Sequence, residues 1–437
     1  MSPAHAWKAE LERPTEAFFR AFAHRIVEPE GVRDAVREAI RALIPRVDWA
    51  GHLPGMPHGL LGLWAVLRLR PFLDARAFHR LLALQLLAFA RTGRARPGQG
   101  LLAVGQGSGH WPHVELALRT HRPDLAWGEL QGMEPISVQH FQALMPLAGP
   151  DMANVGHKAV ALHRAGNLFE LLEAPRVGGR RLLGWAAWMA ASEPEDTYWH
   201  RRMARRLEGW KAPVPLGRTQ APEDHRALAE VIDAQGLVAT FDAVASVVKA
   251  GWGRGDLLAA LVQAAAWKLL DARPDMEGKT GWPLVCLATL GAWPGPEDPA
   301  LWGQAAALVN LYPSEASEDR LRPQPRDPGP DPCGSLREAI LDGEPERALD
   351  LVVPALATEG TEAVLQGLAA TVAHNDPGLD QSGQALTLAA AVELIPGLPE
   401  QGETELLVSV AKSLANSQAS GDLGMQADRA LKAVLKS

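Results

Sequence analysis

Histidine is the residue type with the most chemistry to offer in this chain, and the closest pair is His110 and His113. The 437-residue sequence holds 14 histidines, against 2 cysteines and 2 tyrosines. His110 and His113 stand three residues apart, with Glu115 close behind, so on a helix both imidazoles would share one face and could bind a metal. Two histidines fill only half of a usual ligand shell, so the spacing favours two histidines at the edge of a loop.

The other histidines form no ligand motif by spacing. His157 and His163 share a predicted helix, but their six-residue separation places them about 120° apart around its axis, so this pair alone cannot chelate one ion. No histidine has an acidic residue three positions before it, which excludes the Glu-x-x-His pairs of di-iron helix bundles. H-E-x-x-H is also absent, which excludes the common zinc-protease arrangement.

A glycine-rich loop at residues 105–109 reads Gly-Gln-Gly-Ser-Gly. A dinucleotide-binding loop needs G-x-G-x-x-G, and the third glycine is misplaced for it. A nucleophile elbow needs G-x-S-x-G, and Gln106 occupies the position of its first glycine. The loop is therefore predicted to be a flexible connection.

The elements that must position these side chains are predicted to be helices. Apolar residues recur at three- and four-residue spacing along most of the chain, and no alternating strand pattern is present. A turn-rich stretch, 47–57, is expected to deliver His58 to the start of an apolar helix over 59–69. Another helix is expected over 152–173, with Asp151 as its cap. The predicted fold class is all-α, a multi-helix globular array with a smaller C-terminal helical region.

The chain is expected to divide at a proline-rich run. Residues 313–335 contain six prolines among charged residues, and proline denies such a segment helical hydrogen bonds. We predict a main helical domain over 1–312 with an apolar pocket and a linker or surface loop over 313–335. The C-terminal helical region, 336–437, is expected to pack on the main domain.

Composition and charge exclude several classes of partner. The formal net charge of -8 is spread thinly, and no basic stripe with interleaved aromatic residues is present, which argues against nucleic acid. The longest apolar runs are too short to span a bilayer, and the N-terminus lacks the pattern of a signal peptide. Two cysteines, Cys286 and Cys333, fit a reducing compartment. The expected protein is cytoplasmic, with no membrane partner and an oligomeric state left open.

Three stretches carry a resemblance to a known family. Over 18–87, a helix with paired phenylalanines precedes Ala-Leu-Ile-Pro, a short spacer, His-Gly-Leu-Leu and an Ala-Leu-Arg helix. Residues 281–289 read Gly-Trp-Pro-Leu-Val-Cys-Leu-Ala-Thr, and residues 360–366 read Gly-Thr-Glu-Ala-Val-Leu-Gln. In this order they resemble the questin oxidase-like family. Its members are helical and are associated with oxidative opening of anthraquinone rings in aromatic polyketide (secondary) metabolism, so the resemblance implies an oxidoreductase acting on a bulky aromatic substrate.

The resemblance also implies a mononuclear non-haem iron held by several histidines and helped by a lysine. His58 aligns with the first ligand-type histidine. The other expected histidines and the lysine meet residues that lack their chemistry: Trp64 or Ala65, Cys286, Ala363 and Gln366. One histidine and one cysteine cannot hold iron as the family does.

Three explanations stay open for the altered site. The site is rebuilt from other histidines, the pocket catalyses a metal-free reaction on a related aromatic, or the chain is a pseudoenzyme that serves as a non-catalytic scaffold for a ligand or a protein. The histidines that could rebuild it are His52, His58, His110, His113 and His157.

We expect His58 to be the catalytic residue, as a general base, because an imidazole titrates near neutral pH. Trp64, Cys286 and Thr289 are expected to line the substrate pocket. No metal is predicted; if one is bound, iron is the cofactor that the resemblance implies, and the candidate ligands are His58, His110, His113 and His157. Cys286 is the weaker candidate for a nucleophile, because a buried thiol without a basic partner stays protonated.

Overall fold

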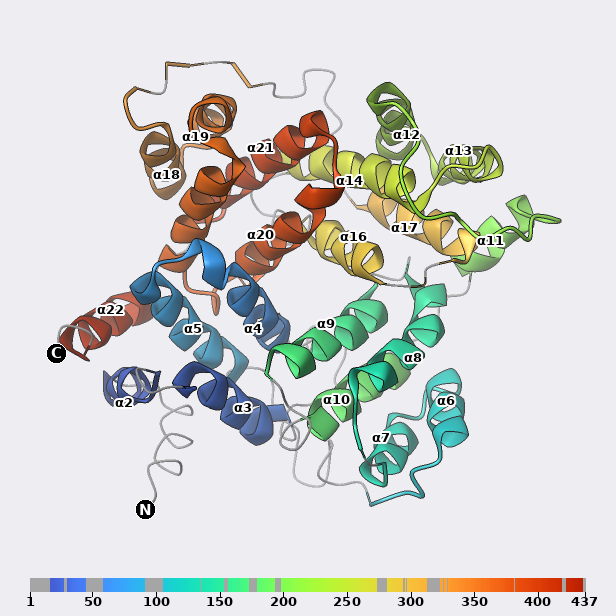
Figure 1. Ribbon diagram of the computed structural model, residues 1–437, viewed down its shortest axis with the longest axis horizontal. Helices are drawn as coiled ribbons and strands as arrows, with labels where there is room; N and C mark the ends of the chain where they lie inside the picture. Colours follow the sequence, from blue (N-terminus) through green and yellow to red (C-terminus); the bar gives the residue numbers. More distant parts are fainter. Residues whose placement is uncertain are drawn as a thin grey trace.

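Apolar residues at three- and four-residue spacing produce helices throughout the computed structural model (Figure 1). The structure describes residues 16–26, 30–44, 58–90, 105–133, 135–152, 156–172, 179–192, 198–272, 281–293, 295, 297–312, 323–324, 326–327, 329–380, 382–418 and 422–434. These residues form 20 α-helices and no strand, which confirms the predicted all-α class.

The first half of the chain contributes most of the helices at the lower left and lower right of Figure 1, and its last helix lies higher on the right. Their bounds are α2 (Glu16–Ile26), α3 (Gly31–Leu43), α4 (His58–Leu69), α5 (Ala75–Ala90), α6 (Trp111–Arg119), α7 (Pro123–Gln131), α8 (Val138–Ala148), α9 (His157–Leu171), α10 (Gly179–Ser192) and α11 (Tyr198–Arg206). Short 3₁₀ turns, η3 (Arg70–Phe72) and η5 (Gly149–Asp151), follow α4 and α8.

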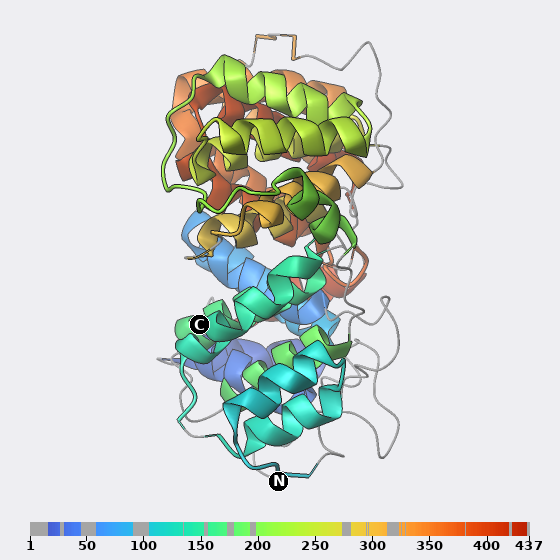
Figure 2. The same ribbon diagram turned by 90° about the vertical axis from the view of Figure 1, so that its right-hand side faces the viewer.

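The second half of the chain supplies the upper part of the molecule, except for its last helix, which lies at the left of Figure 1 beside α2 and α5. Its helices are α12 (Pro222–Ala234), α13 (Leu237–Lys249), α14 (Arg254–Leu270), α16 (Trp282–Ala292), α17 (Pro299–Leu311), α18 (Pro332–Leu341), α19 (Pro345–His374), α20 (Gly383–Leu394), α21 (Glu400–Asn416) and α22 (Asp422–Val434), with the 3₁₀ turn η6 (Ile395–Gly397) after α20. Figure 2 shows α14 and the cyan helices α6 and α7 near opposite ends of the molecule.

Four helices, α4, α9, α16 and α20, meet at the centre. Helix α4 packs against α20 and α9, and α16 packs against the same two helices (Figure 1). Helices α4, α16 and α20 are buried on nearly every side. Apolar residues all around a helix require such a position, because a helix with one wet face carries polar residues there.

Two helices begin elsewhere than the sequence predicts. The helix expected from residue 152 starts at His157, and its N-cap is Gly156 rather than Asp151. Gly156 adopts a positive φ of 69°, which lies outside the helical range, so α9 begins after it. Helix α18 starts at Pro332, where the missing N–H of proline breaks no helical hydrogen bond.

Helices from beyond the proline-rich run return to those before it. Helix α20 packs on α4 and α16, α21 packs on α14, and α22 packs on α2 and α5. Inside the run, Arg326 forms an ion pair with Asp350 of α19 at 2.8 Å. The division into 1–312, 313–335 and 336–437 stays a prediction. No helix in the described part of the chain is both long and apolar enough to cross a membrane.

Candidate functional site

Three aromatic side chains meet where three helices begin. His58, His157 and Trp282 are the first residues of α4, α9 and α16. The imidazole centroids of His58 and His157 lie 6.4 Å apart, and the Trp282 indole lies 5.4 Å from the first and 5.1 Å from the second. The N-terminal ends of the three helices are therefore brought together. We call His58, His157 and Trp282 the histidine junction.

Gly156 fixes the start of α9 against α16. Its φ of 69° is left-handed, and a Cβ at this position would lie only 2.8 Å from the sulfur of Cys286. Glycine meets both demands, since it tolerates positive φ and has no Cβ. The Cys286 thiol, one turn after Trp282, therefore packs directly against the residue that precedes His157.

The start of α4 is held from the other side by Gln85 of α5. Gln85 is fully buried, and its Nε2 donates hydrogen bonds to the Gly59 carbonyl at 2.8 Å and to the Ser382 hydroxyl at 2.9 Å. Gly59 also lies close to α5, where a Cβ would meet the Phe89 backbone at 2.6 Å. These contacts set the position of His58 relative to α5 and α20.

The surroundings of His157 disfavour a positive charge. Burial, and secondly the charge on His58, lower the pKa of His157 to about 3. The dipole of α9 acts in the same direction, because it places partial positive charge at the start of the helix, beside the ring. His157 is therefore neutral near pH 7, and a neutral imidazole has one nitrogen that donates and one that accepts a hydrogen bond.

A second polar group lies two turns further along α9. Arg164 is fully buried, and its guanidinium stacks on the Trp64 indole, with 3.7 Å between Cζ and the ring centroid. Its Nη1 donates to Glu393 Oε2 at 2.8 Å and to Asn167 Oδ1 at 3.2 Å. Sequence reasoning missed Arg164 and Glu393. The signal that could have found Arg164 is a lone charge in an apolar face, seven residues after His157.

The remaining residues predicted to line a pocket lie on α16. Burial raises the pKa of the Cys286 thiol far above its usual range despite the nearby charge of Arg164, so the thiol stays protonated and is a poor nucleophile. Thr289 is fully buried, and its hydroxyl donates to the Val285 carbonyl at 3.0 Å. The structure thus brings Cys286 to the histidine junction, while the Thr289 hydroxyl is used within its own helix.

The donors at the histidine junction do not fit the iron site that the family resemblance implies. Within the described ranges, no three histidine, cysteine or acidic side chains converge closely enough to hold a metal ion. Cys286 is a protonated thiol, and Gln366 of α19 is exposed, so neither replaces a missing ligand. His52, another predicted candidate, lies outside the described residues.

The pair His110 and His113 lies at the start of α6, a helix on the far side of α9 and α10 from α4 (Figure 1). The His110 and His113 rings are 4.7 Å apart and both residues are exposed. Glu129 accepts hydrogen bonds from the Ser108 hydroxyl at 2.6 Å and from the His110 backbone at 3.1 Å, and lies 3.5 Å from His113 Nδ1. Ser108 donates to the carboxylate rather than to an imidazole, so it does not form the serine–histidine pair of a catalytic triad.

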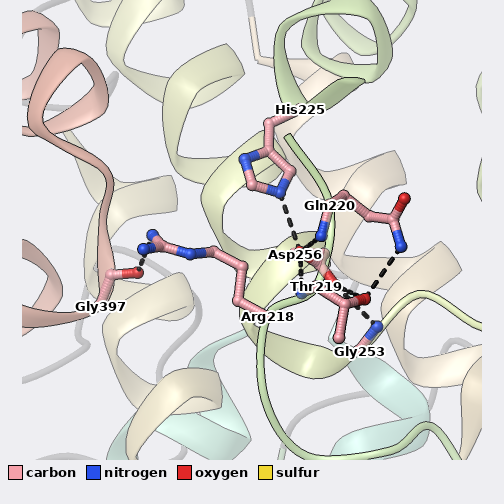
Figure 3. Close-up of polar contacts among 7 residues, drawn as sticks. All are labelled: Arg218, Thr219, Gln220, His225, Gly253, Asp256 and Gly397. Atoms are coloured by element: carbon pink, nitrogen blue, oxygen red, sulfur yellow. Dashed lines mark hydrogen bonds and ion pairs between the residues drawn. The ribbon is translucent and has the colours of Figure 1, made fainter. Parts of the chain in front are cut away.

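A buried carboxylate that sequence reasoning also missed is shown in Figure 3. Asp256 of α14 accepts hydrogen bonds from the backbone N–H groups of Thr219, Gln220 and Gly253, each at 3.0 Å, and lies 3.0 Å from His225 Nε2. Burial alone would raise the pKa of Asp256, but these hydrogen bonds outweigh it and hold that pKa below its usual value. We call Asp256 and these four partners the aspartate node. It ties the loop before α12 to the start of α14.

An open cleft of about 460 Å³ lies between α11 and the start of α17. His200 and Asp298 line it, with 3.4 Å between His200 Nε2 and the carboxylate. Asp298 also accepts a hydrogen bond from the Ala300 backbone at 2.9 Å, so it caps α17. None of the residues predicted from the sequence to form a site lines this cleft.

Comparison with known proteins yields no relative from which to transfer a function. No protein family model matches the chain, and neither a curated protein nor a solved structure matches it. The histidine junction is therefore interpreted from its own geometry.

Proposed function

We propose that this chain binds a bulky aromatic small molecule at the histidine junction, where His58 exchanges a proton with it and neutral His157 forms a hydrogen bond to it. In this proposal the chain is a metal-independent relative of the questin oxidase-like family. The observation that supports it is the meeting of two imidazoles and an indole at the starts of α4, α9 and α16. His58, the position aligned with a ligand histidine, lies in this group.

The chemistry of the junction favours a hydroxylated aromatic. The Trp282 indole offers a surface on which flat rings stack. His58 can accept the proton of an acidic hydroxyl, and neutral His157 can donate a hydrogen bond to the oxygen that loses it. The three helix N-termini stabilise the oxyanion that results, because the helix dipoles place partial positive charge there. Hydroxyanthraquinones combine flat fused rings with acidic hydroxyl groups.

Titration with 1,8-dihydroxyanthraquinone tests the proposal. We expect wild-type protein to bind the probe, measured by calorimetry, and to shift its visible absorption towards that of the phenolate. His157→Asn should weaken binding by about tenfold, the equivalent of about 1.4 kcal/mol, and remove the spectral shift. His110→Asn changes an exposed histidine of the surface pair and should bind as wild type does. Equal binding and equal spectral shifts in the two variants would place the probe elsewhere and overturn the proposal.

A non-catalytic helical scaffold is the second candidate function, and the close packing of the three rings favours it. Trp282 is only 7% exposed and lies within 5.4 Å of both imidazoles, as core residues do. In that case Trp282→Ala would lower stability and nothing else. The two candidates differ in whether dihydroxyanthraquinone raises the melting temperature of wild-type protein, because only a ligand that binds the folded state stabilises it.

A further inference from the structure

The guanidinium of Arg164 contains two buried nitrogens that have no hydrogen-bond partner among the described residues. Its Nη1 serves both Glu393 and Asn167, whereas Nε and Nη2 bond to neither. Buried N–H groups in folded proteins are nearly always paired, and an unpaired one costs its full desolvation. We therefore expect Nε and Nη2 to bind an acceptor that the described residues do not supply.

The two nitrogens lie on the same edge of the guanidinium. Nε–H and one N–H of Nη2 point in parallel, and this spacing matches the two oxygens of one carboxylate. Stacking on Trp64 at 3.7 Å holds the plane of the group, and therefore the direction of this edge. A lysine ammonium presents no such edge.

The charges around Arg164 are unbalanced. Glu393 is shared between Arg164 Nη1, at 2.8 Å, and Arg68 Nε, at 3.8 Å, so two guanidiniums face one carboxylate. His163 adds no charge near pH 7, because burial and then the charge of Arg164 lower its pKa to about 3. The cluster of Arg68, Arg164 and Glu393 therefore carries an excess positive charge, which one further carboxylate would neutralise.

A purely structural role explains only part of this arrangement. Connecting α9 to α20 requires Nη1 and Glu393, and the contact with α4 requires only the flat face that stacks on Trp64. Neither contact uses the edge formed by Nε and Nη2. That edge is the feature a structural connection leaves unexplained.

We propose that Arg164 binds a carboxylate of the ligand, so that the substrate class is an aromatic carboxylic acid. Arg164 follows His157 by seven residues on one face of α9, a rise of about 10 Å, which is close to the length of three fused aromatic rings. The ligand then places its hydroxyl at the histidine junction and its carboxylate at Arg164. This inference rests on the proposed function, because it extends the same site.

Anthraquinone-2-carboxylate and anthraquinone-2-carboxamide are the matched probes, since they share rings and shape and differ in charge. Calorimetry at pH 7.5 should show wild-type protein binding the carboxylate about tenfold more tightly than the amide. Arg164→Lys keeps a charge but loses the two-nitrogen edge, so it should lose most of this preference. Arg164→Met should abolish it. Asn167→Ala removes a contact to Nη1 only and should retain the wild-type preference.

Melting temperatures of the variants separate a loss of folding from a loss of ligand recognition. If Arg164→Met does not fold, Arg164→Lys tests the role of Arg164 in binding the carboxylate. Arg164→Lys could instead lower the affinity for both probes equally and leave the preference for the carboxylate intact. Arg164 would then have a structural role, and this inference alone would be overturned. Failure of wild-type protein to bind either probe would overturn the proposed function as well. So would His157→Asn binding both probes as wild type does.

Discussion

His157 and His225 are both buried histidines, but their neighbours differ. His225 lies 3.0 Å from the carboxylate of Asp256, which also accepts three backbone hydrogen bonds and belongs to the aspartate node. His157 packs against the rings of His58 and Trp282, and its pKa is lowered to about 3. A carboxylate that binds a histidine and three backbone groups fixes local structure. A neutral imidazole beside a second imidazole keeps one nitrogen that donates and one that accepts a hydrogen bond, which a ligand can use.

This difference separates a structural histidine from a candidate functional one without reference to any relative. Burial does not distinguish the two, since His225 is 2% exposed and His157 is 7% exposed. What distinguishes them is the partner of the ring. It follows that disrupting the aspartate node should change stability, whereas changes at the histidine junction should alter ligand binding and the response of stability to pH.

Removing the carboxylate of the aspartate node should give the largest effect. Asp256→Ala leaves three backbone N–H groups and His225 without their acceptor, so the free energy of unfolding should fall by about 3–5 kcal/mol, measured by urea denaturation. Asp242→Ala is the control, since Asp242 is 63% exposed and pairs with Arg206 at the surface, where loss of a pair costs less than about 1 kcal/mol. Similar losses in the two variants would contradict a structural role for the node.

Acid should weaken the aspartate node only at low pH. The pKa of Asp256 is held below its ordinary value of 3.8 in the folded chain, because its hydrogen bonds favour the ionised carboxylate. The stability it contributes is therefore present above pH 3.8 and is lost as the pH falls below that value.

The histidine junction should respond to pH in a higher range. The pKa of His157 is 6.5 in the unfolded chain and about 3 in the folded one, so between these values the unfolded chain binds a proton that the folded chain excludes. Stability should fall as the pH drops from 6.5, by about 1.4 kcal/mol per pH unit for one such histidine. His163 has the same shift and should add an equal slope.

Variants test this slope by urea denaturation at pH 6.0, 5.25 and 4.5. His157→Asn should remove about half of the slope that the two histidines contribute, and His157→Asn with His163→Asn should remove nearly all of it. Asp380, whose pKa burial raises to about 6, gives the opposite slope over this range, but it is present in every variant and cancels. A wild-type slope in the double variant would show that His157 is not held neutral.

Local pattern was sufficient to predict the helices and the start of α4. The apolar periodicity is local information, and a turn-rich stretch ahead of His58 indicates where the helix begins. The sequence also pointed to His58, Trp64 and Cys286, which the structure places on the central helices α4 and α16. Their roles in a site stay a prediction.

The start of α9 and the polar partners could not be read from local pattern. Gly156 takes its positive φ where it packs on Cys286, which is distant in the chain. Arg164 is buried against Glu393, 229 residues away, and Asp256 lies beside His225, 31 residues before it. A charged residue in an apolar helix is expected to reach solvent unless a partner is known, and these partners come from the tertiary fold.

The smallest expected effect comes from removing metal ions, and it bears directly on the character of the histidine junction. The described residues offer two imidazoles and a protonated thiol there, and nowhere do they bring three metal-binding side chains together. Treatment with EDTA should therefore leave the affinity for 1,8-dihydroxyanthraquinone unchanged, and purified protein should contain iron well below one atom per chain by mass spectrometry. Stoichiometric iron that disappears in His58→Ala would instead make the junction a metal site. His58 and His157 would then be neutral ligands, and His58 could not act as a base, since a metal and a proton compete for the same nitrogen lone pair.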